Sequence, residues 1–186
     1  MTTAAVVLAA GAGSRFAGPT HKLLAPLDGR PVVAHVLDAV TAAGFDAVYV
    51  VDGAVSLVGV VPPSAVLVHN ARWAEGQAGS LRLAVDAAAA AGHDAVVVGL
   101  GDQPRVTAEA WRRVAGTDSP IAVASYGGVR RNPVRLARAV WALLPDEGDE
   151  GARVVMRARP ELVTEVPCDG EPLDVDTVED LRRLGG

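Results

Sequence analysis

Five short apolar runs recur along the chain, and each is continuous rather than alternating with polar residues. Such runs, bounded by glycine, proline or polar residues, are typical of strands buried on both faces of a parallel sheet. The predicted strands are residues 4–8, 47–51, 65–68, 95–100 and 121–125.

The segments between these runs carry apolar residues at helical spacing instead. In residues 31–43, Val33, Val36 and Val40 fall on one face, and Gly44 is placed to end a helix. Further helices are predicted over residues 79–91, 107–115, 135–144 and 178–184, and a hairpin turn at residues 127–128.

This alternation of strands and helices predicts an α/β fold with three αβα layers around a Rossmann-like, mostly parallel sheet. The length suits one hydrophobic core, so we expect residues 1–186 to form a single domain. Ligands of such sheets bind beyond the carboxyl ends of the strands. The segments after Leu8 and after Leu100 lie at such ends and are the first places to look for chemistry.

Composition narrows the class of partner. The formal net charge is -5 and no long basic stretch occurs, so neither nucleic acid nor an anionic membrane is expected as a partner. The single cysteine, Cys168, allows no internal disulfide and favours a reducing cytoplasm. No cation precedes the apolar residues 4–10, so these predict a buried strand rather than a signal peptide.

A glycine-rich loop follows the first strand, with the sequence Leu-Ala-Ala-Gly-Ala-Gly-Ser-Arg-Phe from Leu8 to Phe16. Small residues let backbone N–H groups approach an anion closely, so the loop is a candidate phosphate site. Phe16 stands where a nicotinamide-binding fingerprint needs its third glycine, and no Gly-Lys-Ser/Thr triplet of a P-loop occurs. A plain strand-to-helix turn is the alternative.

Lys22 is the only lysine in the chain, and it lies six residues after Phe16. A lysine ammonium is a compact charge that can follow phosphate oxygens through a reaction, whereas arginine binds in a fixed planar geometry. Because the loop independently indicates phosphate, we interpret Lys22 as functional rather than as a chance lysine on a solvated loop.

Carboxylates that could hold Mg²⁺ occur in two segments. Asp102 follows the strand at residues 95–100, and Asp174 and Asp176 lie in an acidic segment near the C-terminus. One or two carboxylates commonly bind Mg²⁺ together with substrate phosphates. Helix capping is the alternative for each segment. Asp174 and Asp176 project to opposite sides of an extended chain, and we favour Asp176 as the ligand.

Together these segments resemble the MobA-like nucleotidyltransferases, most closely the branch that includes molybdenum cofactor cytidylyltransferase. The resemblance rests on Leu-Ala-Ala-Gly-x-Gly-x-Arg-Phe followed by Lys-Leu-Leu, on Asp-Gln-Pro at residues 102–104, and on the acidic segment at residues 174–181. It implies a fold of the nucleotide-diphospho-sugar transferase type. The nucleotide-binding residues that it implies are Leu8, Ala9, Ala10, Gly11, Ala12, Gly13, Ser14, Arg15, Lys22, Gly79 and Ser80.

The resemblance also implies an activity. It implies transfer of a nucleoside monophosphate, CMP from CTP, to a phosphorylated small molecule, molybdopterin, with release of pyrophosphate. Lys22, Arg15 and Asp102 would be catalytic, and Asp102 and Asp176 would hold Mg²⁺. A molybdoenzyme or its chaperone would then be a protein partner.

One departure leaves the acceptor open. Arg130-Arg131-Asn132-Pro133 stands where the cytidylyltransferase branch usually has Gly-His-Pro, while residues 148–153 resemble a segment near its acceptor. The alternatives are a sugar-phosphate nucleotidyltransferase, a GTP-using guanylyltransferase and a nucleotide-binding regulator without catalysis. This chain has Ala10 where guanylyltransferases tend to have glycine. The alanine favours CTP, because its methyl group takes room that a purine would need.

Overall fold

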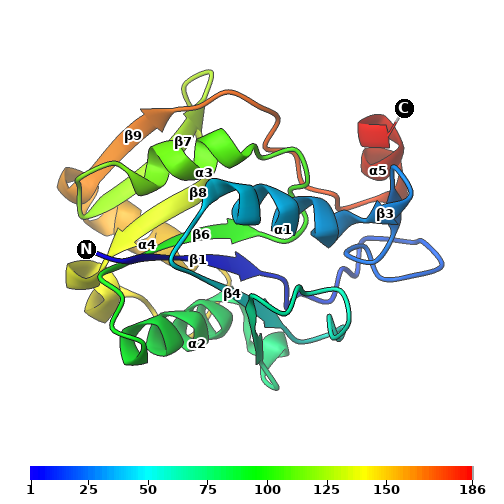
Figure 1. The fold of residues 1–186 in the computed structure, drawn as a ribbon, viewed down its shortest axis with the longest axis horizontal. Helices are drawn as coiled ribbons and strands as arrows, with labels where there is room; N and C mark the ends of the chain where they lie inside the picture. Colours follow the sequence, from blue (N-terminus) through cyan, green and yellow to red (C-terminus); the bar gives the residue numbers. More distant parts are fainter. Residues whose placement is uncertain (186) are drawn as a thin grey trace.

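A computed structural model describes residues 1–185, and its centre is a seven-stranded sheet (Figure 1). The strands lie in the order β5 (Val66–His69), β4 (Ala47–Asp52), β1 (Thr3–Leu8), β6 (Ala95–Leu100), β8 (Val129–Ala137), β7 (Ile121–Tyr126) and β9 (Val163–Pro167). The strand β8 runs antiparallel to both of its neighbours, and the other pairings are parallel. The predicted mostly parallel α/β sheet is confirmed.

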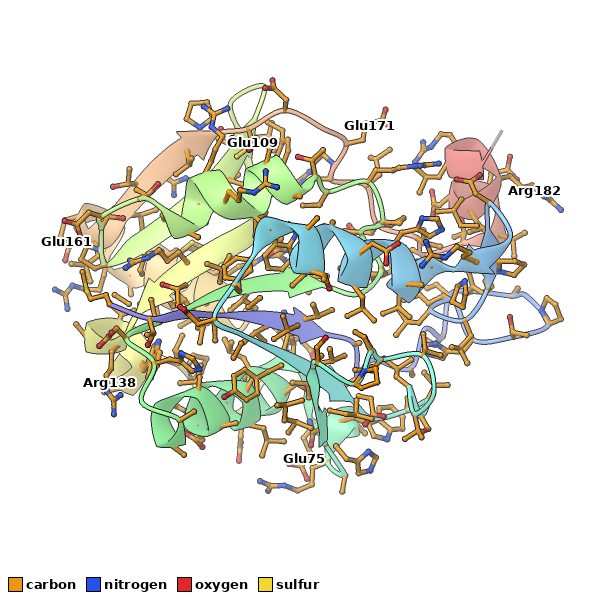
Figure 2. All side chains as sticks on the ribbon, viewed as in Figure 1. Glu75, Glu109, Arg138, Glu161, Glu171 and Arg182 are labelled. Carbon is orange, nitrogen blue, oxygen red and sulfur yellow. The ribbon has the colours of Figure 1, made fainter. Side chains whose placement is uncertain are left out.

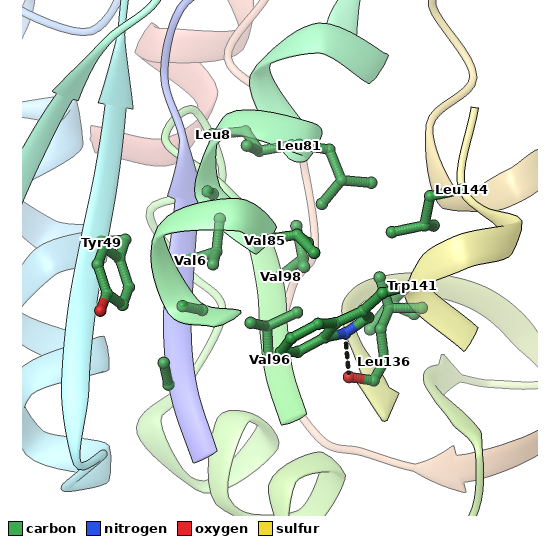
Figure 3. Packing of buried hydrophobic residues seen from close by; sticks show 14 of the residues in the cluster. Val6, Leu8, Tyr49, Leu81, Val85, Val96, Val98, Leu136, Trp141 and Leu144 are labelled. Carbon is green, nitrogen blue, oxygen red and sulfur yellow. Dashed lines mark hydrogen bonds between the residues drawn. The ribbon is translucent and has the colours of Figure 1, made fainter. Parts of the chain in front are cut away.

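Helices cover both faces of this sheet. One face packs against α1 (Val32–Ala43) and α3 (Ala108–Ala115), and the other against α2 (Gln77–Ala90) and α4 (Ala152–Ala158). On the α2 face, Leu81 and Val85 lie over Val96 and Val98 of β6, and the Trp141 indole donates to the Leu136 carbonyl at 3.0 Å (Figure 3). The central strands are thus apolar throughout because both of their faces are buried.

Smaller elements complete the chain. A two-stranded ribbon joins β2 (Pro26–Leu27) to β3 (Arg30–Pro31), and α5 (Val178–Gly185) packs on it through a small apolar cluster that includes Leu27 and Leu184. Short 3-10 helices span Trp73–Glu75, Arg138–Leu143 and Pro160–Leu162. Labelled charged side chains such as Glu75, Arg138 and Arg182 project outward from the ribbon (Figure 2).

The predicted helix over residues 135–144 is wrong. Arg135 to Ala137 end the strand β8, and a 3-10 helix follows. Arg135 is buried and donates to the Ser119 carbonyl, a tertiary contact that the local apolar spacing could not reveal. The predicted hairpin turn joins β7 to β8, and Gly127 and Gly128 both have positive φ, as a tight hairpin requires.

The carboxyl ends of β1 and β6 meet at one edge of the sheet. The loop after β1 is fixed at its base because Ala9 donates to the Val51 carbonyl, and Gly101 donates to the Leu8 carbonyl. Val175 donates to the Asp102 carbonyl, which brings the C-terminal segment to the same edge. Within residues 1–185, no helix combines the length and the apolar character needed to cross a membrane.

Candidate functional site

A cleft of about 380 Å³ opens at the carboxyl ends of β1 and β6. The loop after β1 forms one wall, the start of α2 forms the second, and the carboxylates near Lys22 form the third. The lining includes every predicted residue of the loop, namely Leu8, Ala9, Ala10, Gly11, Ala12, Gly13, Ser14 and Arg15, together with Lys22, Ser80, Asp102 and Asp176.

The path of the loop depends on Gly13. This residue has φ +62°, and a Cβ there would lie 3.1 Å from Lys22 Cγ and 3.2 Å from His21 Nε2. A side chain would be strained at this φ and would push against Lys22. Glycine therefore lets the loop lie directly against the base of the only lysine.

His21 holds the loop in this position. The Leu23 N–H lies 3.3 Å from His21 Nδ1, so Nδ1 accepts and Nε2 can donate to the Gly11 carbonyl at 3.0 Å. Burial is the main reason that the pKa of His21 lies below its ordinary value, and the nearby Lys22 charge adds to the effect. The neutral tautomer with its proton on Nε2 thus ties the tip of the loop to the chain before Lys22.

The loop amides are oriented without partners of their own. Among residues 1–185, the N–H groups of residues 11–14 donate to no protein acceptor, while Phe16 N–H closes a turn onto the Gly13 carbonyl. Successive backbone N–H groups without protein partners can together bind an anion. Because residues 11–14 line the cleft, their N–H groups are available to an anion that enters it.

Lys22 lies between two carboxylates. Its Nζ is 2.5 Å from Asp102 Oδ2 and 3.0 Å from Asp176 Oδ1. Arg15 reaches the other oxygen of Asp176 at 2.9 Å, and this arginine side chain is 74% exposed. Burial alone lowers the pKa of Lys22, but attraction to Asp102 and then Asp176 outweighs it and raises that pKa. Lys22 is therefore held as a cation beside the glycine-rich loop.

The three aspartates of the C-terminal segment have different partners. Asp176 faces the cleft, whereas Asp174 accepts from Gln103 Nε2 at 2.8 Å. Burial and then the nearby Asp102 raise the pKa of Asp174. Asp180 accepts from the N–H and hydroxyl of Thr177 at the start of α5, so its role is that of a helix cap.

The carboxylates beside Lys22 fit a divalent cation. Asp102 Oδ1 is buried without a hydrogen-bond partner in residues 1–185, and its other oxygen shares Lys22 with Asp176. Groups of three or more metal-binding side chains do not occur in the described part of the chain. Two carboxylates nevertheless suffice for Mg²⁺, which usually keeps waters and substrate phosphates as its other ligands.

The start of α2 supplies the remaining wall. Ser80 is buried, lines the cleft, and accepts from Asn70 Nδ2 at 2.9 Å. Gly79 does not line the cleft, because it lies on the other side of this helical turn, in a neighbouring hollow with Asn70 and Asp146. The predicted pair is thus split, and Gly76 and Gln77 line the cleft with Ser80 instead.

Trp73 and Gln77 line the cleft but were not predicted as site residues, whereas Asp149 of the lining falls in residues 148–153, which the resemblance placed near the acceptor. A Cβ at Gly53 would lie 2.6 Å from Trp73 Cβ and 3.0 Å from Ala10 Cβ, so this glycine permits the 3-10 helix at residue 73 to close on the loop. Gly76 likewise allows the Gly148 carbonyl to accept from the Ala78 N–H at 2.9 Å. Gly53 and Gly76 were therefore the sequence signal that could have indicated close contacts at these places.

Known proteins with similar sequences and folds identify the family of this chain. The model of the MobA-like NTP transferase domain matches residues 5–183. Nicotine blue oxidoreductase from Paenarthrobacter nicotinovorans is 34% identical over 197 residues, which cover 96% of this chain and 94% of that protein.

Solved structures extend the likeness to the whole fold. The crystal structure of Rv0371c from Mycobacterium tuberculosis H37Rv has a TM-score of 0.86 at 32% identity and covers 100% of this chain and 97% of its own. The same protein has been solved in complex with manganese. A nucleotidyl transferase from Methanothermobacter thermautotroptrophicus has a TM-score of 0.81 at 25% identity, over 99% of this chain and 96% of its own.

The family model covers nearly the full chain, and a relative of over 30% identity spans almost all of it. A glycine-rich loop lining the cleft, a lysine between two carboxylates and a mostly parallel sheet are the features of this site and fold. The chain therefore belongs to the MobA-like NTP transferase family and is a nucleotidyltransferase.

Proposed function

We propose that this protein transfers CMP from CTP to a phosphorylated small molecule, molybdopterin or its molybdenum-loaded form. The observation that carries the proposal is Lys22, whose Nζ contacts Asp102 and Asp176 beside the loop amides. A cation and two carboxylates next to backbone donors without protein partners suit phosphoryl chemistry, because they can stabilise the charge that develops during transfer.

The reaction is a direct in-line displacement. An oxygen of the acceptor phosphate attacks the α-phosphorus of CTP, the bond from that phosphorus to the bridging oxygen of the β-phosphate breaks, and pyrophosphate leaves. The loop amides of residues 11–14 hold the triphosphate in position. Lys22 and Arg15 stabilise the negative charge that develops on the phosphate oxygens.

Asp102 and Asp176 are the residues that would hold Mg²⁺. The manganese complex of Rv0371c supports a divalent cation in this fold. When bound, the cation would neutralise charge on the phosphates and on the departing pyrophosphate.

Base selection is assigned to Ala10 and Ser80, which line the cleft from opposite walls. The methyl group of Ala10 narrows the space that a purine would need. Ser80 Oγ already accepts from Asn70, so its own proton is available for an acceptor on the base edge, such as the cytosine carbonyl.

Release of pyrophosphate tests the proposal. The purified protein is incubated with Mg²⁺ and each of CTP, GTP, ATP and UTP, with and without molybdopterin. We expect pyrophosphate only when molybdopterin is present, and fastest with CTP. Preference for GTP would overturn the cytidylyl assignment, and turnover only with sugar phosphates would replace molybdopterin by that class of acceptor.

A second candidate comes from the Paenarthrobacter relative, whose name states an oxidoreductase. By that likeness this chain would catalyse a redox reaction, and one that used a nicotinamide cofactor would need a dinucleotide-binding loop. The loop sequence argues against it, because Phe16 replaces the third glycine of the dinucleotide fingerprint. Oxidation of NADH or NADPH in the presence of a quinoid dye, without NTP, would favour this candidate over nucleotidyl transfer.

A further inference from the structure

A second, larger cavity of about 640 Å³ borders the nucleotide cleft. It lies on the α2 and α4 face of the sheet, and the two spaces share Leu8, Gln77 and Leu100 in their linings. Its volume falls in the range of ordinary small-molecule sites. A molecule bound there would border a nucleotide in the first cleft.

The floor of this second cavity is apolar. It is formed by aliphatic side chains from α2 and from β6, β7 and β8, with Met156 of α4 beside them. Such a floor leaves the hydroxyl groups of a sugar without partners, at a cost, while a flat aromatic or heterocyclic body would bury apolar area against it. Methionine sulfur also packs well against aromatic rings.

The rim of the cavity is cationic, but its four arginines differ. Arg130 is paired with Glu165 at 2.8 Å, and Arg157 is paired with Glu150. Arg131 and Arg153 line the cavity and form no ion pair with a carboxylate of residues 1–185. Two arginines are therefore available to bind an anionic group of a ligand.

Neither of these arginines lines the nucleotide cleft. The acceptor phosphate that attacks CTP must enter that cleft, so it is a different group from the anion that Arg131 and Arg153 would bind. Arg131 and Asn132 also belong to the segment that departs from the family's usual Gly-His-Pro. The residues that depart from the family's usual sequence therefore line the second cavity.

We propose that Arg131 and Arg153 bind a second anionic group of the acceptor, apart from the phosphate that attacks, while a flat part of the same molecule lies against the apolar floor of the second cavity. The identification of the molecule as the acceptor rests on the proposed function. The cavity, its floor and its two unpaired arginines stand independently of it.

A pair of fluorescent probes tests the site without catalysis. Anilinonaphthalene sulfonate has an aromatic body and one anion, and N-phenylnaphthylamine has a similar body without the charge. We expect Arg131→Gln and Arg153→Gln each to weaken sulfonate binding about tenfold, as loss of a charge-assisted hydrogen bond does. Binding of the neutral probe should stay within about twofold.

Arg113→Gln is the matched control, because Arg113 is an exposed arginine of α3 on the opposite face of the sheet. It should leave the affinity for both probes unchanged. Ala152→Trp fills the cavity from the first residue of α4 and should exclude both probes. Arginine variants that bind the sulfonate as tightly as the unmodified protein would overturn the proposal.

Two further measurements separate this inference from the proposed function. Saturating CTP should leave the sulfonate probe bound, since the two cavities are distinct. Displacement of the probe by CTP would place it in the nucleotide cleft and would overturn the inference. Lys22→Ala should retain probe binding while pyrophosphate release is lost. Failure of nucleotidyl transfer with intact, arginine-dependent probe binding would refute the function alone.

Discussion

The two neighbouring cavities are lined by different chemical groups. The nucleotide cleft presents backbone N–H groups and the Lys22 cluster, whereas the second cavity presents an aliphatic floor and an arginine rim. Backbone donors can hold the same triphosphate in many sequences, because they depend on loop geometry more than on side chains. The second cavity is instead lined mainly by side chains, so by our proposal its ligand would depend on the sequence more strongly than the triphosphate does.

Substitution of Lys22 should produce the largest effect on activity, and this effect should be confined to the nucleotide cleft. Lys22→Ala is expected to lower kcat/KM by ~10²-fold or more, because a positioned charge is lost from the transition state. Steady-state pyrophosphate release measures it, and an unchanged melting temperature shows an intact fold. Arg30→Ala is a suitable control, since Arg30 forms only an exposed ion pair with Asp38. Near-normal turnover of Lys22→Ala would show the lysine to be incidental.

The next largest effect should distinguish Asp176 from Asp174. Asp176→Asn is expected to cost roughly 10–100-fold in activity at limiting Mg²⁺, the range typical of damaged metal sites. Asp174→Asn should cost less than about tenfold, because Asp174 contacts Gln103 rather than Lys22. Activity is measured across a Mg²⁺ titration for both variants. The reverse order of damage would move the metal site to Asp174.

Ala10→Gly tests how the nucleotide cleft discriminates between CTP and GTP. Shape alone commonly discriminates by ~10–200-fold, so removal of one methyl group should relax a preference for CTP over GTP by about tenfold. Single-turnover pyrophosphate release with each nucleotide measures the ratio. An unchanged ratio would show that polar contacts, such as those of Ser80, carry base selection.

The smallest effect should come from Ser80→Ala. This change removes the acceptor for the buried Asn70 Nδ2, and it should lower the free energy of unfolding by about 1 kcal/mol. Urea denaturation measures it, with the exposed Ser64→Ala as the control. A loss of CTP affinity without any loss of stability would instead show that Ser80 acts only on the base.

Much of this molecule could be predicted from sequence, and the failures have physical causes. The central strands and the loop after β1 are encoded locally, by continuous apolar runs and by small residues. The strand β9 was missed because it is a short edge strand with exposed polar positions. The helix α4 was missed because its single buried residue, Val155, gives too weak a period. Each of these depends on contacts far away in the chain.

The candidate site shows the same division. The sequence predicted Lys22, Asp102 and Asp176, and the structure brings these three side chains together from segments as far as 154 residues apart. The ion pairs among them could not be foreseen, since one chain shows no convergence. The second cavity was signalled only in part: residues 130–132, 150, 152 and 153 of its lining fall in segments that the sequence had singled out, while its apolar floor comes from α2 and three strands that carry no local sign of a shared cavity.

The base and the tip of the loop after β1 should differ in the rate at which their amide hydrogens exchange with solvent. The base is held by the hydrogen bonds of Ala9, Ala54 and Gly101, while the N–H groups of residues 11–14 at the tip have no protein acceptor in the described part of the chain. Deuterium from the solvent should therefore enter the amides of the tip quickly and those of the base slowly. A bound triphosphate would cover the tip and slow its exchange, so the deuterium uptake of these four amide groups would report whether the cleft is occupied.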